Sequence, residues 1–315
     1  MKKFFTLFLA AICCAVMINA ATEGALNGKF TINASGDQIV FSKGNLQYVG
    51  TWQFATHQWD CIGDAQADDN RDLFGWGTGD APNKFMDDAG EYATFHEWGA
   101  NSITNGGNTA NAWRTLTSDE WRYLFESRTN STDFFGVGII GTMHGAILLP
   151  DNWTLPDGAA FVSVSAKGYE LQTEYDGYYT INGSSWTDNE YTIEQWAVME
   201  EAGAVFLPAA GDINISSGFE RLGVMGGYWS ATTYDEWAAY GFLFFEDEVY
   251  PTANDFLINN GNSVRLVQAA PEDATGIDTP SLQGRSGEAS KVIRDGQLLI
   301  IRDGKTYNAL GAEMK

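Results

Sequence analysis

Cysteine is scarce in this sequence, which has three among its 315 residues. Cys13 and Cys14 lie near the N-terminus, and Cys61 stands alone in the rest of the chain. Cys13 and Cys14 belong to an N-terminal segment that we expect to be cleaved, as described below. The remaining chain keeps Cys61 alone and forms no internal disulfide, so a disulfide-stapled scaffold is excluded. We expect core packing to hold the fold together, because a chain of roughly 290 residues buries about three quarters of its unfolded surface.

Basic residues are also few. Lysine and arginine number 18 against 41 aspartates and glutamates, and the formal net charge is −23. Such a chain repels phosphate backbones, so nucleic acid is excluded as a partner. Anionic membranes and sulfated or uronic glycans are disfavoured for the same reason, whereas neutral glycans, proteins and cations stay open. The charge also serves solubility.

Recognisable catalytic motifs are missing. The three histidines, His57, His96 and His144, lie far apart, and no His-x-x-x-His spacing supports a zinc hydrolase. Residues 223–227 form neither a nucleophile elbow nor a phosphate-binding loop. The carboxylates are too numerous to single out the converging pair of a glycosidase. We therefore assign no catalytic residue.

The N-terminal segment has the composition of a secretory signal peptide. It begins Met-Lys-Lys, continues with an apolar run from Phe4 to Ile18 and ends on the small residues Ala20 and Ala21. The run is too short for a comfortable membrane span. We predict a signal peptide at residues 1–21, no span after its cleavage, and a protein that is secreted or at the cell surface, in the periplasm or on the outer-membrane exterior.

Aromatic residues and glycine are abundant, with 11 Trp, 13 Tyr, 19 Phe and 35 Gly. This composition is typical of a loop-rich domain that contains β-strands. Short runs of alternating or apolar character between turn residues predict the strands. The strand candidates are residues 29–39, 40–48, 52–59, 204–207, 227–231, 238–245 and 263–267.

Two short helices are indicated by capping boxes. Thr117 with Glu120 three residues later begins the first, and Thr192 with Gln195 begins the second. Apolar residues before each cap, Leu116 and Tyr191, are placed to pack on Trp121 and Trp196. Each helix is expected to span about 10 residues and to depend on tertiary packing. Gly203 is placed to end the second.

The C-terminal region changes character. Residues 269–290 are rich in Pro, Gly, Ser, Asp and Glu and predict a linker. Residues 291–315 contain Arg-Asp-Gly twice, and turns at Asp295-Gly296 and Asp303-Gly304 predict a small β-meander tail. It resembles the C-terminal tails of many exported bacterial proteins. The tail either engages a partner sheet or export and surface machinery, or docks on its own domain.

Four motifs in order carry a resemblance to a known family. They are residues 115–121 (Thr-Leu-Thr-Ser-Asp-Glu-Trp), 206–211 (Phe-Leu-Pro-Ala-Ala-Gly), 228–232 (Tyr-Trp-Ser-Ala-Thr) and 263–267 (Ser-Val-Arg-Leu-Val). Their order resembles the formylglycine-generating-enzyme-like branch of the C-type-lectin-like fold, in a group of exported bacterial surface proteins. The resemblance implies one α+β domain at residues 22–268, with two short helices and irregular antiparallel sheets.

The resemblance does not extend to the family's chemistry. The enzymes use a cysteine pair to bind copper, and this chain keeps Cys61 alone. Calcium-dependent lectins of the fold carry Glu-Pro-Asn or Gln-Pro-Asp and disulfides, and this chain has neither tripeptide. We expect no catalysis and no cofactor, with calcium left open. Asp64, Asp68, Asp69 and Asp72 offer oxygen ligands, although a solvated acidic loop is the preferred interpretation.

Glu120 and Arg265 are charges beside large apolar neighbours. A buried charge needs a partner. We expect the two to pair with each other, or each to make backbone bonds, in a structural bridge.

Aromatic residues next to carboxylates are the candidates for ligand binding, since a ring stacks on a ligand while carboxylates accept hydrogen bonds. One loop supplies Tyr234, Asp235 and Trp237, with Trp229 expected in the core. A second supplies Trp186, near Tyr178 and Tyr179. Tyr175, Asp176 and Asp188 belong to the same second loop. The ligand-binding prediction is Trp237, Tyr234, Asp235 and Trp186, although a polar hairpin surface would also explain the second loop.

We therefore expect an exported or cell-surface protein that binds a neutral glycan or a protein partner by loops on a rigid scaffold. One alternative is an enzyme, either an oxidase relative with altered chemistry or an acid hydrolase. Another is a structural subunit of a surface assembly, with the tail as its contact element. The fold does not decide among them, because one scaffold hosts many functions.

Overall fold

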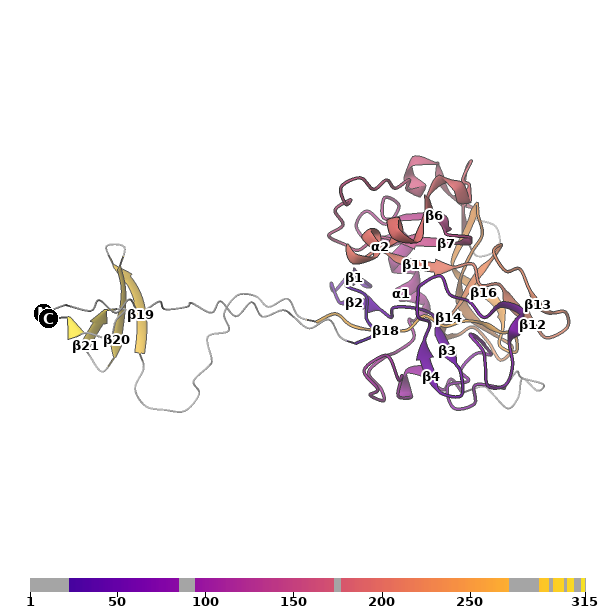
Figure 1. Ribbon diagram of the computed structural model, residues 1–315, viewed down its shortest axis with the longest axis horizontal. Coiled ribbons are helices and arrows are strands. Elements are labelled where there is room, and N and C mark those ends of the chain that lie inside the picture. The colour runs from indigo at the N-terminus through magenta and orange to yellow at the C-terminus, as the bar shows by residue number, and fades with distance from the viewer. Residues whose placement is uncertain are drawn as a thin grey trace, which may run out of the picture. The chain divides into compact units, whose positions relative to one another are not determined.

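The computed structural model describes residues 23–84, 94–172 and 177–271, and the strands of a C-terminal unit (Figure 1). The chain divides into two compact units, Met1–Pro271 and Glu272–Lys315. The predicted signal peptide, residues 272–288 of the predicted linker and both Asp-Gly turns lie outside the described residues. Tyr175 and Asp176 of the second aromatic loop lie outside them as well.

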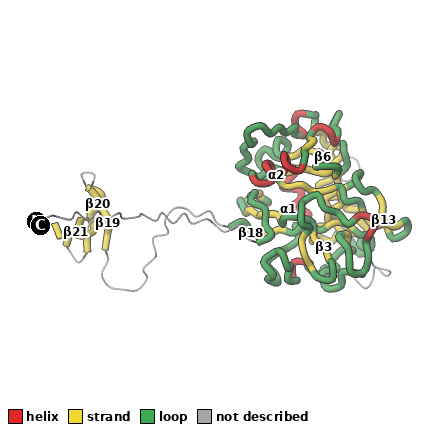
Figure 2. Tube along the Cα trace, viewed as in Figure 1, coloured by secondary structure: helices red, strands yellow, loops and turns green. Residues whose placement is uncertain are grey.

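The first unit is a mixed helix-and-sheet domain made mostly of strands, which confirms the predicted class (Figure 2). Its α-helices are α1, Ser118–Arg122, and α2, Ile193–Glu201. A π-helical turn, Tyr123–Ser127, continues α1, so the two together match the predicted length. Short 3-10 turns occur at Gly63–Ala65, Trp98–Ala100, Val164–Ala166 and Trp186–Asp188.

Both predicted capping boxes are confirmed. The Thr117 hydroxyl accepts from the Glu120 N–H, and the Glu120 carboxylate accepts from the Thr117 N–H. Thr192 and Gln195 exchange the same pair of bonds at the start of α2. Each box provides acceptors for two backbone N–H groups that a free helix end would leave without partners.

A seven-stranded sheet forms the centre of the domain, in the order β5-β17-β14-β15-β16-β9-β8. Neighbouring strands are antiparallel except β14 and β17. Its strands are β5 Leu73–Phe74, β8 Tyr169–Gln172, β9 Tyr178–Ile181, β14 Gly226–Thr233, β15 Ala238–Phe244, β16 Glu248–Leu257 and β17 Asn262–Ser263.

A second sheet of four strands supports α2. The order is β10-β6-β7-β11, and α2 lies against this sheet (Figure 1). The inner side chains Trp196 and Met199 pack there with Ile147 and Phe206. The strands are β6 Phe135–Ile140, β7 Met143–Leu148, β10 Glu190–Tyr191 and β11 Val205–Pro208.

Three small sheets complete the domain. Their strands are β1 Phe30–Thr31, β2 Gln38–Phe41 and β18 Val267–Ala269; β3 Leu46–Tyr48 and β4 Trp52–Phe54; and β12 Asp212–Asn214 and β13 Gly218–Glu220. β18 pairs with β2, so strand pairing carries the domain to Ala269. The predicted strand at residues 263–267 is instead two short strands in different sheets, joined by an irregular stretch at residues 264–266.

The second unit is the antiparallel meander that the sequence predicts. Its order is β19-β20-β21-β22, and each strand pairs with the next along the chain. The strands are β19 Ala289–Arg294, β20 Gln297–Arg302, β21 Lys305–Asn308 and β22 Glu313–Met314.

Aromatic stacking joins α1 to the central sheet. The rings of Trp121 and Phe125 lie over Phe242 of β15, with centroids 5.1 and 4.2 Å from it. Leu116, which precedes the cap, and Trp121, which lies inside the helix, are both buried in this core, as predicted. Stacked aromatic pairs add about 1 kcal/mol beyond the area they bury. The core therefore fixes the hairpin of β14 and β15 from one side.

Within residues 23–84, 94–172, 177–271 and the tail strands, no helix has the length and apolar character needed to cross a membrane.

Removal of the cap of α2 tests the helix assignment. We expect Thr192→Ala to lower the free energy of unfolding by about 1 kcal/mol, because one N-terminal N–H loses its acceptor. Urea unfolding followed by circular dichroism measures the change. Thr192→Ser keeps the hydroxyl and serves as the control, with a change of a few tenths. Equal losses in both variants would contradict the capping role.

Candidate functional site

The β14–β15 turn holds an exposed aromatic ring in a fixed position. The Asp235 carboxylate accepts from the N–H groups of Trp237 and Ala238, at 2.7 and 2.8 Å. The indole Nε1 of Trp237 donates to Glu236 Oε1 at 2.9 Å. Tyr234 and Asp235 both donate their N–H groups to the Ala238 carbonyl. The Trp237 residue is nevertheless 57% exposed, and its ring stacks on no other ring of the described residues.

Two further apolar side chains extend this surface. Tyr234 is 49% exposed, and its ring meets Tyr240 edge-on at 5.3 Å. Leu257 lies opposite Ala238 in the pairing of β15 with β16 and is also exposed. We call Tyr234, Trp237 and Leu257 the hairpin-tip surface. Exposed apolar groups that belong to one turn and its neighbouring strand are a candidate binding surface.

Trp186 does not belong to this surface. It is only 8% exposed, stacks on His144 at 5.1 Å and meets Phe244 edge-on. Phe244 and Ala238 are the two ends of β15, and seven residues at about 3.3 Å each separate those ends by roughly 20 Å. The structure therefore brings Tyr234, Asp235 and Trp237 together and places Trp186 at the opposite end of the strand.

A hollow of about 480 Å³ lies beside Trp186. The Trp186 N–H donates to Glu246 Oε1 at 2.8 Å, and His144 Nδ1 donates to the Gly223 carbonyl at 2.6 Å. We call it the Trp186 hollow, and its lining residues are His144, Trp186, Gly223, Val224, Phe245, Glu246, Asp247 and Glu248. Of these lining residues, the sequence prediction named Trp186 alone as ligand-binding. A local signal for the others is the run Glu246-Asp247-Glu248 at the turn from β15 to β16.

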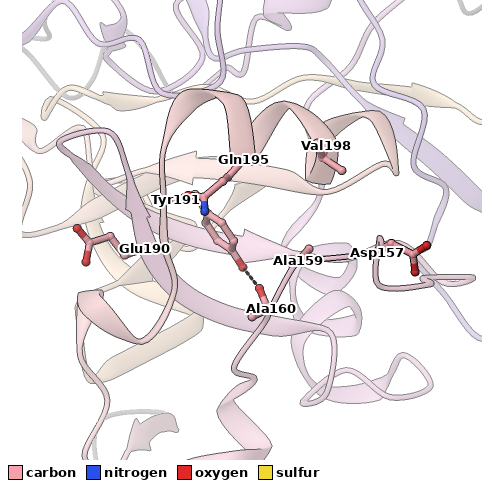
Figure 3. A pocket seen from close by; sticks show the side chains of 8 residues that line it. Asp157, Ala159, Ala160, Glu190, Tyr191, Gln195 and Val198 are labelled. Carbon is pink, nitrogen blue, oxygen red and sulfur yellow. Dashed lines mark hydrogen bonds between the residues drawn. The ribbon is translucent and has the colours of Figure 1, made fainter.

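A smaller pocket of about 190 Å³ lies between α2 and residues 157–160 (Figure 3). The Tyr191 hydroxyl donates to the Ala160 carbonyl at its base. Burial raises the pKa of Tyr191 to about 12, so the phenol stays a neutral donor near pH 7. Figure 3 shows the carboxylates of Asp157 and Glu190 at opposite ends of the pocket. They do not form the paired arrangement that acid–base chemistry on one bond needs.

Glu120 is structural, but its partner is not the expected one. Its two carboxylate oxygens accept from Arg114 Nη1 and Nη2 at 2.8 and 2.7 Å. Arg114 also exchanges two backbone bonds with Val267. The predicted pairing with Arg265 is wrong, because the capping box holds Glu120 at the start of α1 beside Arg114. Glu120 thereby links α1 to the strand that ends the domain.

Arg265 is fully buried in a polar network. Its Nη2 donates to Gln58 Oε1 at 2.9 Å, and Nη1 donates to Asn45 Oδ1 at 3.3 Å. Gln58 Nε2 donates in turn to Glu200 Oε2 at 2.8 Å, and Gln58 Oε1 also accepts from the Phe206 N–H. Burial lowers the pKa of Arg265 to about 10, and Tyr228 and Glu200 oppose the shift. The guanidinium is still charged at neutral pH.

The acidic loop divides into one buried and three exposed carboxylates. Asp72 is buried and accepts from the Ile62 N–H and from Gln66 Nε2. The exposed carboxylates are Asp64, Asp68 and Asp69. Among the residues that the structure describes, no three His, Cys, Asp or Glu side chains group as a metal site would require.

The other aromatic residues singled out in the sequence have structural contacts. Trp229 is buried in the core, as predicted, and its Nε1 donates to the Phe74 carbonyl at 2.6 Å. Tyr178 stacks on Tyr250, and Tyr179 stacks on Tyr169. Asp188 closes a capping box with Ser185 and accepts from Lys167 Nζ at 2.6 Å. These contacts hold the hairpin of β8 and β9 and the turn after it.

Comparisons of the chain with protein-family models, with curated proteins and with solved structures found no match.

Truncation of Gln58 tests the buried network. We expect Gln58→Ala to lower the free energy of unfolding by about 3 kcal/mol or more, because Arg265 and the Phe206 N–H lose an acceptor inside the core. Chemical denaturation at pH 7 measures the loss. Gln53→Ala, at the half-buried position of β4, is the control and should change stability by less than about 1 kcal/mol. If Gln58→Ala also lost less than about 1 kcal/mol, the network would not be important for stability.

The buried carboxyl of Asp72 predicts a pH dependence. Burial raises its pKa above the ordinary 3.8, although bonds from Gln66 and Ile62 oppose the shift. The folded state therefore binds this proton more tightly than the unfolded state. The resulting stability is present below the ordinary pKa and is lost as pH rises through the folded pKa.

We therefore expect the stability of the native protein, relative to Asp72→Asn, to be greater at pH 4 than at pH 7. Denaturant titrations of both proteins at the two pH values measure the difference. Asp69→Asn, at an exposed position, should show no such change with pH. If the difference in unfolding free energy between the native protein and Asp72→Asn were the same at pH 4 and pH 7, the raised pKa of Asp72 would be contradicted.

Proposed function

We propose that this protein is a non-catalytic, exported binding protein that recognises a neutral polysaccharide through the hairpin-tip surface. The observation that carries the proposal is Trp237, whose ring is exposed but held by bonds from both its backbone and its indole. A ring fixed in this way loses little entropy when a ligand covers it. Rigid aromatic residues are accordingly preferred anchors in binding surfaces.

The chemistry of the surface favours a sugar. An aromatic face covers the C–H face of a pyranose ring, and nearby carboxylates accept from its hydroxyls. Trp237 and Tyr234 supply faces, and Asp235 and Glu236 supply carboxylates in the same turn. The net charge of −23 opposes anionic glycans and leaves neutral ones. Recognition of this kind requires no calcium.

The C-type-lectin-like architecture belongs to the same proposal. Its support is the position of the motifs: Glu120 and Trp121 lie in α1, and Trp229 lies in β14 beside β17. Arg265 follows β17 in the buried network. In this architecture loops carry recognition while the core stays constant. Export to the cell surface or the medium places the surface where polysaccharides occur.

The state of the buried and half-buried carboxylates supports binding over catalysis. In the described part of the chain, Glu120 is bound by Arg114, Asp212 by Arg221, and Asp72 by Gln66. Each is used in a structural contact. Among the described residues, no comparable geometry supports an enzyme related to the formylglycine-generating oxidases or a surface-assembly subunit.

A glycan array with the full chain tests the proposal. We expect dose-dependent binding to neutral polysaccharides and a loss of at least tenfold in affinity for Trp237→Ala, since truncating a central aromatic anchor of a binding surface costs about 2 kcal/mol or more. Repeating the titration with a chelator reports whether calcium contributes.

Leu171→Ala is the matched control, because Leu171 is an exposed apolar residue of β8 outside the hairpin tip. Its affinity should stay within twofold of the native value. Binding that Trp237→Ala leaves unchanged, or an array without any neutral-glycan signal from folded protein, would refute the proposal.

A further inference from the structure

We propose that the Trp186 hollow is a second binding site, which takes an arginine side chain from a partner polypeptide. This inference is independent of the hairpin-tip surface, because the hollow lies at the other end of β15. It rests on the shape of the hollow, its aromatic wall, its charge and the exposed apolar rim beside it.

The hollow is built from fixed parts. Trp186 and His144 stack at an interplanar angle of 19°, and Trp186 packs edge-on against Phe244 of the core. The bond from His144 Nδ1 to the Gly223 carbonyl fixes the orientation of the imidazole. In the neutral ring the proton is therefore on Nδ1, and Nε2 is a hydrogen-bond acceptor. Phe245 completes the aromatic lining. A volume of about 480 Å³ is ample for one long side chain.

The charge of the hollow is of one sign. Glu246, Asp247 and Glu248 line it, and no lysine or arginine does. None of the three carboxylates forms an ion pair with a described residue. Glu246 accepts from the Trp186 N–H, and Glu248 accepts from the Tyr250 hydroxyl, so neutral donors orient both groups without cancelling their charge. The arrangement favours a cation.

The geometry favours an organic cation over a metal ion. A metal needs several oxygens within about 2.6 Å of one point. The side chains of the hollow do not group in this way within the described residues. A guanidinium is wider, bonds to separated carboxylates and stacks on aromatic faces. Phe245 and the edge of the Trp186–His144 stack provide apolar contact for it.

The rim indicates that the cation belongs to a polypeptide. Val224 lines the hollow and is 54% exposed. A free amine would leave it uncovered. A chain carrying an apolar residue beside its arginine would cover it, and the net charge of −23 would attract a basic partner.

A synthetic peptide, acetyl-Gly-Leu-Arg-Leu-Gly-amide with a fluorophore, tests the site on the full protein. We expect saturable binding by fluorescence anisotropy at low salt. Replacing arginine by citrulline, which is neutral and nearly isosteric, should weaken it at least tenfold. The double variant Asp247→Asn/Glu248→Gln should weaken the arginine peptide to a similar extent.

The control double variant is Asp69→Asn/Glu201→Gln, which removes the same charge from exposed positions outside the hollow, in the acidic loop and at the end of α2. It should bind within twofold of the native protein, and so should Trp237→Ala. Equal losses in both double variants would show general charge attraction and overturn the proposal. So would the absence of saturation, or binding of free arginine amide as tight as that of the peptide.

Discussion

The domain depends on keeping one buried positive charge hydrogen-bonded. Arg265 lies where the chain passes from the central sheet to the small sheet of β18, and this stretch has no regular strand to fix it. Gln58 and Asn45 supply the acceptors, and Gln58 connects the arginine to Glu200 at the end of α2. Four distant segments are therefore joined at one point, and an uncompensated charge there would cost several kcal/mol.

This internal anchoring leaves the ends of the central sheet free for recognition. The stacked aromatic core of α1 and β15 holds the middle of the β14–β15 hairpin. At one end of β15 the turn exposes Trp237, and at the other end the Trp186 hollow opens. The two surfaces differ in chemistry, since one is an aromatic platform and the other an acidic, aromatic-walled hollow. A protein with both suits the joining of a polysaccharide to a protein partner.

The sequence predicted what local chemistry determines. Both capping boxes, the mixed helix-and-sheet class, the buried Trp229 and the tail meander follow from short-range patterns. Long-range partners did not follow. Glu120 was assigned to Arg265 because both flank apolar residues, whereas the structure pairs it with Arg114, only six residues away. Trp186 looked like an exposed loop residue, but it begins a 3-10 turn and is buried against His144 and Phe244, which are distant in the sequence. β6 and β7 were missed because glycines interrupt their apolar pattern.

The central claim is that Trp237 forms the ligand-binding platform. The most direct test is a ¹H–¹⁵N spectrum of the tryptophan indoles during titration with a neutral oligosaccharide found by the array. The account predicts that the Trp237 Nε1 signal shifts or broadens with ligand concentration while those of the buried Trp121 and Trp229 stay fixed. A titration that leaves Trp237 unchanged while the ligand binds would contradict it.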